Sequence, residues 1–87
     1  MELNGEAYNK RNCLKQTLQY IKQENDIQRK ELINKMSAGF YINTSTAKDW
    51  LNTLDNAGCI EDKYEGLEIT EDGKDRIEMY EKREKMV

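Results

Sequence analysis

The sequence contains no histidine and no proline, and it has only two cysteines and one tryptophan. Without histidine, the chain lacks the most common general base and the most common nitrogen ligand of zinc. The two cysteines, Cys13 and Cys59, cannot complete a tetrahedral zinc site on their own. The absence of proline favours helices over a fold built from proline-containing loops. We therefore expect a helical protein that binds no metal.

Long hydrophobic runs are also absent, since no segment approaches the roughly 20 apolar residues of a membrane span. The first six residues have neither the basic region nor the apolar run of a signal peptide. The spacing of the two cysteines is not that of a disulfide framework, so we interpret both as reduced thiols rather than as a disulfide. These features predict a cytoplasmic protein without a membrane partner.

The length of 87 residues supports one hydrophobic core, so residues 1–87 are expected to form a single domain. Charged residues make up 36% of the chain, but the apolar residues recur periodically, which argues against disorder. The net charge of −3 is unevenly distributed. Residues 1–50 carry eight basic and six acidic groups, whereas residues 51–87 carry six basic and eleven acidic groups. Only the amino-terminal half is therefore suited to face phosphates.

Apolar periodicity predicts three helices, over residues 8–23, 28–38 and 43–57. Gly39 is expected to end the second helix in a left-handed conformation, and Gly58 to end the third.

The third predicted helix has two chemically different sides. Asn43 can cap its amino terminus. At 100° per residue, one side is apolar and consists of Ala47, Trp50, Leu51 and Leu54. The opposite side is polar and short-chained, with Ser45, Lys48, Asp49, Asn52 and Asn56.

Two short strand-like runs, residues 59–63 and 67–70, surround a turn that contains Gly66 and predict a β-hairpin. Ile27 alone is expected to form a single-residue backbone pairing with this hairpin. Thr70 can cap a last helix that begins at Glu71. The predicted fold class is α+β, mostly α, with an arm at residues 1–7, a core at 8–70 and a carboxy-terminal helix at 71–87.

Two stretches carry a family resemblance. In residues 42–60, a Ser/Thr-rich cap precedes a small residue, two leucines spaced by three and Ala-Gly-Cys-Ile. Residues 67–74 read Leu-Glu-Ile-Thr-Glu-Asp-Gly-Lys. Together they resemble the recognition helix and wing of the winged helix-turn-helix family of bacterial and archaeal regulators. The long last helix resembles that of small archaeal winged-helix proteins that dimerise through a carboxy-terminal helix pair. The resemblance implies a three-helix core, a short β-hairpin wing and a long carboxy-terminal helix.

Two features depart from the family pattern. The turn from Ser37 to Ile42 is longer than the usual three or four residues of this motif. The wing carries Asp62 and Glu65, so it offers only Lys63 and Tyr64 to a phosphate.

The resemblance implies that the protein binds double-stranded DNA, as a transcription regulator or a small nucleoid-associated architectural protein, with helix 43–57 in the major groove. The residues expected to contact DNA are Thr44, Ser45, Lys48, Asp49 and Asn52 on this helix, Gln28, Arg29 and Lys30 before it, and Lys63 and Tyr64 on the wing. The alternative interpretation of the polar helix side is an ordinary solvated surface.

Four apolar residues remain after the expected core is filled, and we assign them to a homodimer interface: Leu3, Tyr80, Met86 and Val87. No catalytic constellation or glycine-rich phosphate loop is present, so we expect neither an enzyme nor a cofactor. The acidic wing motivates a competing hypothesis, a winged-helix protein-interaction module that does not bind DNA. An acidic DNA-mimicking inhibitor is a third hypothesis, which the basic amino-terminal half opposes.

Overall fold

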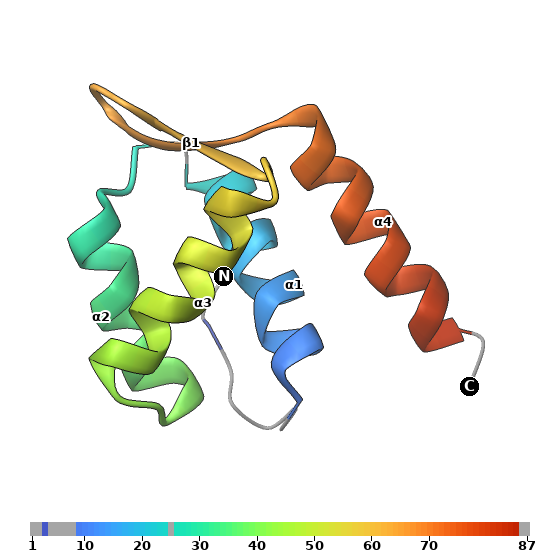
Figure 1. The fold of residues 1–87 in the computed structure, drawn as a ribbon, viewed down its shortest axis with the longest axis horizontal. Helices are drawn as coiled ribbons and strands as arrows, with labels where there is room; N and C mark the ends of the chain where they lie inside the picture. Colours follow the sequence, from blue (N-terminus) through green and yellow to red (C-terminus); the bar gives the residue numbers. More distant parts are fainter. Residues whose placement is uncertain (1–2, 4–8, 25, 86–87) are drawn as a thin grey trace.

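The computed structural model describes residue 3 and residues 9–24 and 26–85. Four helices and one hairpin follow one another as α1 (Lys10–Gln23), α2 (Arg29–Phe40), α3 (Thr44–Asn56), β1 (Ile60–Lys63), β2 (Gly66–Ile69) and α4 (Glu71–Lys85) (Figure 1). This order confirms the predicted α+β, mostly helical fold class and is compatible with a winged-helix layout.

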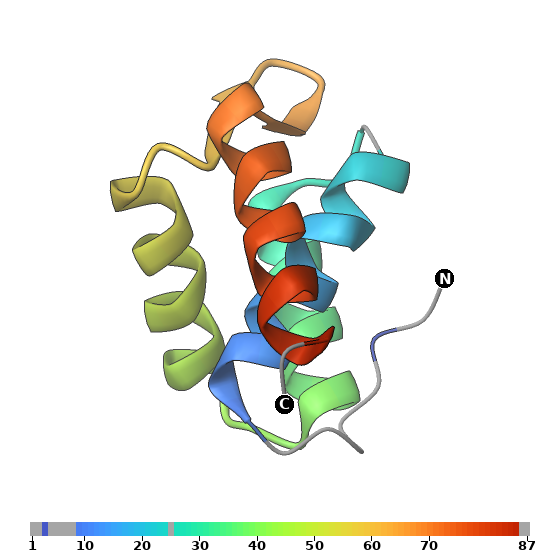
Figure 2. The same cartoon turned by 90° about the vertical axis from the view of Figure 1, so that its right-hand side faces the viewer.

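The elements enclose one hydrophobic core. Helix α2 packs against α3, α1 packs against α4, and the hairpin crosses one end of the helices (Figures 1 and 2). The centre is formed by fully buried side chains of the first three helices and β2, namely Leu18, Ile21, Leu32, Met36, Leu51 and Leu67. The outward side of α3 therefore remains free of the core.

Asparagine side chains cap two of the helices. The Asn9 Oδ1 atom accepts a hydrogen bond from the Asn12 amide at 2.7 Å at the start of α1. The Asn43 Oδ1 atom accepts one from the Thr46 amide at 2.8 Å at the start of α3, which confirms the predicted cap. The predicted start of the first helix at Tyr8 lies outside the described residues, and its predicted end at Gln23 is confirmed.

The prediction that Gly39 ends the second helix was wrong. Helix α2 continues through Phe40, and Tyr41 adopts the left-handed conformation with φ 56° and ψ 43°. The extra helical residues bring the Phe40 ring into the core, 6.4 Å from the ring centre of the half-buried Trp50. A Cβ atom at Gly39 would lie 2.6 Å from the Leu3 carbonyl oxygen, so this position is small because the chain passes close by. Burial of the aromatic ring thus outweighs the local stop signal.

The longer α2 also corrects the predicted length of the turn before α3. Only residues 41–43 separate the two helices, so the connection has the ordinary length of a helix-turn-helix. The Ile42 amide donates to the Ser37 carbonyl at 3.3 Å and so fixes the turn against the end of α2.

The hairpin is antiparallel and matches the predicted strands to within a residue. Its register pairs Ile60 with Ile69 and Lys63 with Gly66. The Leu67 amide donates to the Ile27 carbonyl at 2.8 Å, which confirms the expected single-residue pairing. Gly66 has a φ of +146°, and a Cβ atom there would lie 2.5 Å from the Asp26 carbonyl carbon, so only glycine allows this close approach.

The start of α4 is fixed to the end of α3. The Thr70 hydroxyl accepts a hydrogen bond from the Gly73 amide at 3.1 Å, as predicted for a cap, and donates one to the Gly58 carbonyl at 2.6 Å. Gly58 follows the carboxy-terminal end of α3 with a φ of +75°, as predicted for a helix stop. A Cβ atom at Gly73 would lie 2.2 Å from the Cys59 carbonyl oxygen, so only glycine allows the first turn of α4 to approach Cys59 this closely.

Both cysteines are buried, and they are not joined in a disulfide. Burial raises the pKa of Cys13, and burial is also the main cause that raises the pKa of Cys59. Within the described part of the chain, no helix combines the length and hydrophobicity that a membrane crossing requires.

Candidate nucleic-acid interface

Helix α3 presents the predicted residues on its outward side. Ala47, Leu51 and Leu54 are buried, which sets the orientation of the helix. The five predicted side chains of this helix are all exposed: Thr44, Ser45, Lys48, Asp49 and Asn52. The first turn of α3 contains no acidic residue, so the partial positive charge of this helix end is not neutralised there. The structure therefore brings all five residues together on one accessible helix face.

The start of α2 lies next to this face, but two of its three predicted phosphate ligands have partners within the protein. The Gln28 side-chain amide donates to the Glu65 carbonyl at 3.1 Å. Arg29 is held by carboxylates of α3 and β1. Lys30 is exposed. Of the three, Lys30 is the one whose charge remains available to a phosphate.

Arg29 forms an ion-pair cluster with Asp55 of α3 and Asp62 of β1. Its Nη2 atom lies 2.9 Å from Asp55 Oδ2 and 2.7 Å from Asp62 Oδ2, and its Nε atom lies 3.3 Å from Asp62 Oδ1. The contact with Asp62 is therefore bidentate. The hydrogen bond to Asp62 is the largest cause that raises the pKa of Arg29 above its ordinary value. The Arg29 cluster, as we name these three residues, joins α2, α3 and the wing.

Asn52 lies at the edge of this cluster. The Arg29 Nη1 atom is 3.5 Å from Asn52 Oδ1, a long hydrogen-bond distance. The contact places a guanidinium beside the amide oxygen, so the amide nitrogen is the Asn52 group left to face outward.

The wing is strongly acidic. Lys63, one of its two predicted phosphate ligands, forms an ion pair with Glu61 at 3.1 Å, and the hydrogen bond to Glu61 is the largest cause that raises the Lys63 pKa. Glu61 also lies directly opposite Glu68 in the register of the hairpin. Tyr64, the other predicted ligand, is 101% exposed at the wing tip. The wing thus offers an aromatic ring but little free positive charge.

Charge over the whole candidate interface is negative. Residues 29–31, 44–56 and 60–68 together contain seven carboxylates and four cations. Two of the cations, Arg29 and Lys63, are already paired with carboxylates. The net negative charge of this surface therefore opposes long-range attraction of a polyanion such as DNA.

The predicted dimer residues do not form one exposed patch. Tyr80 is 6% exposed and belongs to the core, as does Ile77 one turn before it. Helix α4 packs along α1 (Figure 2), so this side of α4 is buried. The assignment of Tyr80 as an apolar residue left over from the core was wrong. Leu3 is partly buried against the core, and Met86 and Val87 lie outside the described residues.

Sequence reasoning missed the role of Asp55 and Asp62. Their partner Arg29 is 26 and 33 residues away in the chain, so no local spacing signals the cluster. Among the described residues, no group of three or more His, Cys, Asp or Glu side chains is placed to hold a metal ion. Comparison of the sequence with models of protein families and with curated proteins finds no match to either.

Proposed function

We propose that the protein binds double-stranded DNA by inserting α3 into the major groove, and that it acts as a transcription regulator or nucleoid-associated architectural protein. The observation that carries the proposal is the outward side of α3. Its Ser45 and Lys48 side chains are exposed and make no hydrogen bond or ion pair with another described residue. The major groove accepts a helix, and hydroxyl, amide and ammonium groups are the usual donors to phosphates and base edges.

The electrostatics of the interface favour selective over non-specific binding. Lys30 and Lys48 are the cations of the interface that no described carboxylate pairs with. With Lys48 at a base edge and Lys30 at a phosphate, at most two counterions are released per protein, so the slope of log affinity against log salt is expected to be no steeper than about −2. A typical non-specific binder, with many lysine contacts, has a much steeper slope. We therefore expect affinity to depend mainly on base contacts from α3.

The experiment is enrichment of binding duplexes from a random pool, followed by fluorescence anisotropy on the enriched sequence across a salt series. Lys48→Ala and Asn52→Ala are expected to weaken binding about fivefold to a hundredfold, the range of a lost base contact of about 1–3 kcal/mol. Glu78→Gln, on the exposed side of α4, is the matched control and is expected to bind as the wild type. The proposal fails if no sequence is enriched, or if Lys48→Ala and Glu78→Gln bind alike.

The acidic wing and the paired Arg29 favour one alternative, a winged helix that binds a protein instead of DNA. This alternative predicts no enrichment of duplexes. It also predicts a stoichiometric protein partner whose binding survives nuclease treatment and is weakened by reversing the wing charge at Glu61 and Glu68.

The homodimer remains a prediction. The large exposed hydrophobic residues of the described chain are Tyr41 and Tyr64, and neither lies on α4. If two copies bind together, their half-sites are expected about one helical turn of DNA apart. Sedimentation equilibrium of the protein alone and with the enriched duplex distinguishes a monomer from a dimer in each state.

A further inference from the structure

Arg29 lies at the edge of the candidate nucleic-acid interface. Its Nη1 atom is 3.5 Å from Oδ1 of Asn52, one of the exposed residues on the outward side of α3. The next residue along the chain, Lys30, is exposed as well. The guanidinium is therefore at the surface that we propose to face DNA, and it is not buried behind that surface.

The protein itself occupies most of the guanidinium. The Nε and Nη2 atoms of Arg29 donate to the two carboxylate oxygens of Asp62, and Nη2 also donates to Asp55. With the contact to Asn52, these hydrogen bonds account for four of the five N–H groups of an arginine. Arginine binds carboxylates and phosphates in the same bidentate manner. The Asp62 carboxylate thus takes the pair of donors that a DNA phosphate requires.

The Arg29 cluster is exposed enough to exchange one anion for another. Both of its carboxylates are exposed, and the arginine side chain is partly exposed. An ion pair in such a position changes an equilibrium constant by at most about fivefold. A phosphate can consequently displace Asp62 from Arg29, but it binds more weakly than it does to an unpaired arginine.

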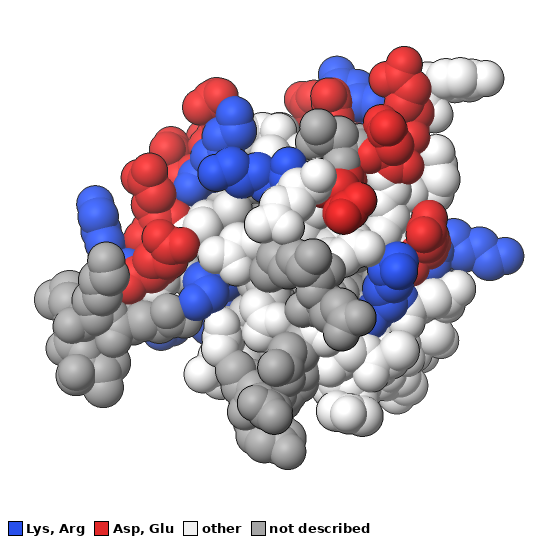
Figure 3. Space-filling model, turned by 180° about the vertical axis from the view of Figure 1, so that it is seen from behind, with Lys and Arg blue, Asp and Glu red and all other residues white. Residues whose placement is uncertain are grey.

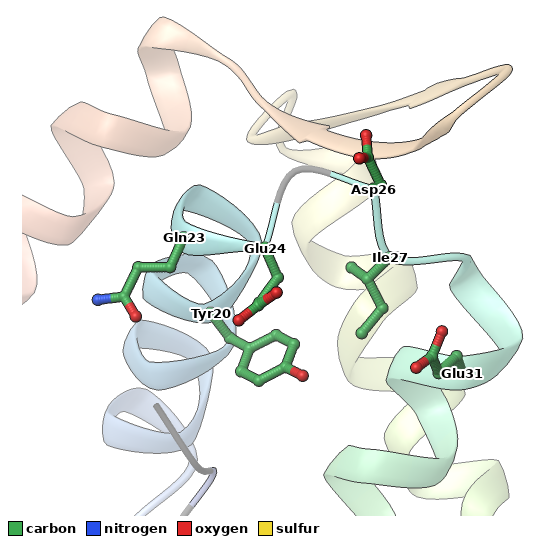
Figure 4. A pocket seen from close by; sticks show the side chains of 6 residues that line it. All are labelled: Tyr20, Gln23, Glu24, Asp26, Ile27 and Glu31. Carbon is green, nitrogen blue, oxygen red and sulfur yellow. The ribbon is translucent and has the colours of Figure 1, made fainter.

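The described surroundings of α2 supply little positive charge in place of Arg29. Toward α1, a hollow of about 390 Å³ is lined by the carboxylates Glu24, Asp26 and Glu31 and by three uncharged residues (Figure 4). On the face seen in Figure 3, the described acidic and basic side chains are interspersed and do not gather into one basic field. The pairing of Arg29 therefore has a large effect on how strongly this protein can hold a phosphate.

We infer that Asp55 and Asp62 are an internal competitor for DNA phosphates, which withholds Arg29 and so limits the affinity for duplex DNA. The inference rests on the proposed function. When Asp62 is neutralised, the guanidinium binds a backbone phosphate of the duplex in addition to Lys30. Phosphate contacts carry no sequence information. The two aspartates thereby lower the part of the affinity that does not depend on sequence.

The test is fluorescence anisotropy of the full chain with the enriched duplex and with a duplex of random sequence, across a salt series. Asp62→Asn is expected to tighten binding to both duplexes about threefold to tenfold at low salt. The slope of log affinity against log salt is expected to steepen by about 0.9, the value for one added phosphate contact. Asp55→Asn removes a single hydrogen bond to Arg29 and is expected to give a smaller gain. Melting curves establish that each variant is folded at the assay temperature.

Two control variants separate the release of Arg29 from a general change of charge. Glu68→Gln removes an exposed carboxylate of the same hairpin that is not part of the Arg29 cluster, and it is expected to tighten binding less than about twofold. Arg29→Ala combined with Asp62→Asn leaves the cluster with one negative charge, which is also its net charge in the wild type. This double variant is expected to bind no more tightly than the wild type.

The outcomes distinguish a failure of this inference from a failure of the proposed function. The inference alone is overturned if the wild type binds the enriched duplex but Asp62→Asn gains no more than Glu68→Gln. It is also overturned if the gain persists without Arg29, or if the salt slope of Asp62→Asn equals that of the wild type. Absence of binding to either duplex, by the wild type and by every variant, would overturn both proposals.

Discussion

The Arg29 cluster is expected to hold the wing against α2 and α3. Replacing Arg29 with alanine removes ion pairs to Asp55 and Asp62 and leaves the two carboxylates facing each other. The arginine side chain is 27% exposed, but the two aspartates are 42% and 58% exposed, so solvent screens both pairs. Measured couplings of exposed pairs are about 0.2–1 kcal/mol, and bidentate geometry in a network favours the upper part of that range.

We therefore expect Arg29→Ala to lower the free energy of unfolding by about 1–2 kcal/mol at low salt. For a domain of this size, each kcal/mol corresponds to a fall of about 4–8 °C in the melting temperature. The loss is expected to shrink in 1 M salt, because the Debye length there is only about 3 Å.

A double-mutant cycle measures the coupling energy between Arg29 and Asp62. Urea unfolding of Arg29→Ala, Asp62→Asn and the double variant is expected to give a coupling energy of about 0.5–1 kcal/mol. The matched control is the more exposed pair of Lys74 and Glu71 on α4, 3.3 Å apart, for which we expect a coupling near zero. Additive effects of Arg29→Ala and Asp62→Asn, or a coupling no larger than that of the control pair, would show that the Arg29–Asp62 ion pair does not stabilise the fold.

Three further predictions concern the supports of the fold. Gly73→Ala places a Cβ atom 2.2 Å from the Cys59 carbonyl oxygen. It is expected to lower the free energy of unfolding, measured with urea, by at least about 1 kcal/mol, the usual cost of overpacking. An unchanged free energy of unfolding contradicts the close contact. Asn43→Ala removes the cap of α3 and is expected to cost about 1 kcal/mol in the same assay, whereas Asn43→Ser should recover most of it; equal losses in the two variants argue against the cap. Burial raises the pKa values of Cys13 and Cys59 from 9.0. As pH rises, the thiols therefore ionise in the unfolded state before they ionise in the folded state. The stability that the two buried thiols contribute below pH 9 is lost as pH rises through their folded pKa values. Urea midpoints from pH 7 to 10 should fall less steeply in Cys13→Ala, and an identical slope contradicts this.

Local signals were sufficient for several elements of the fold. The cap at Asn43 and the cap at Thr70 were predictable because each depends on residues within one helical turn. The pairing of Ile27 with the wing was predictable from a lone apolar residue between two helices. The two sides of α3 followed from helical periodicity alone, and this is why the exposure of Ser45 and Lys48 agrees with the sequence.

Features that depend on distant parts of the chain were not predictable in the same way. Helix α2 continues beyond Gly39 because the Phe40 ring packs near the Trp50 ring of α3. Arg29 was expected at a phosphate, but its nearest partners come from β1 and α3. The burial of Tyr80 is different, since its spacing from Gly73 and Ile77 already placed it on the buried side of α4. In that case the sequence contained the signal and the dimer hypothesis overrode it.

DNA binding through α3 is tested most directly by amide chemical-shift mapping by NMR during titration of the ¹⁵N-labelled protein with an enriched duplex. We expect the largest shifts on residues 44–52 at the start of α3 and on Lys30, and small shifts along α4. Shifts confined to α1 and α4, or no shifts at saturating duplex, would contradict the claim that the outward side of α3 is the DNA-binding surface.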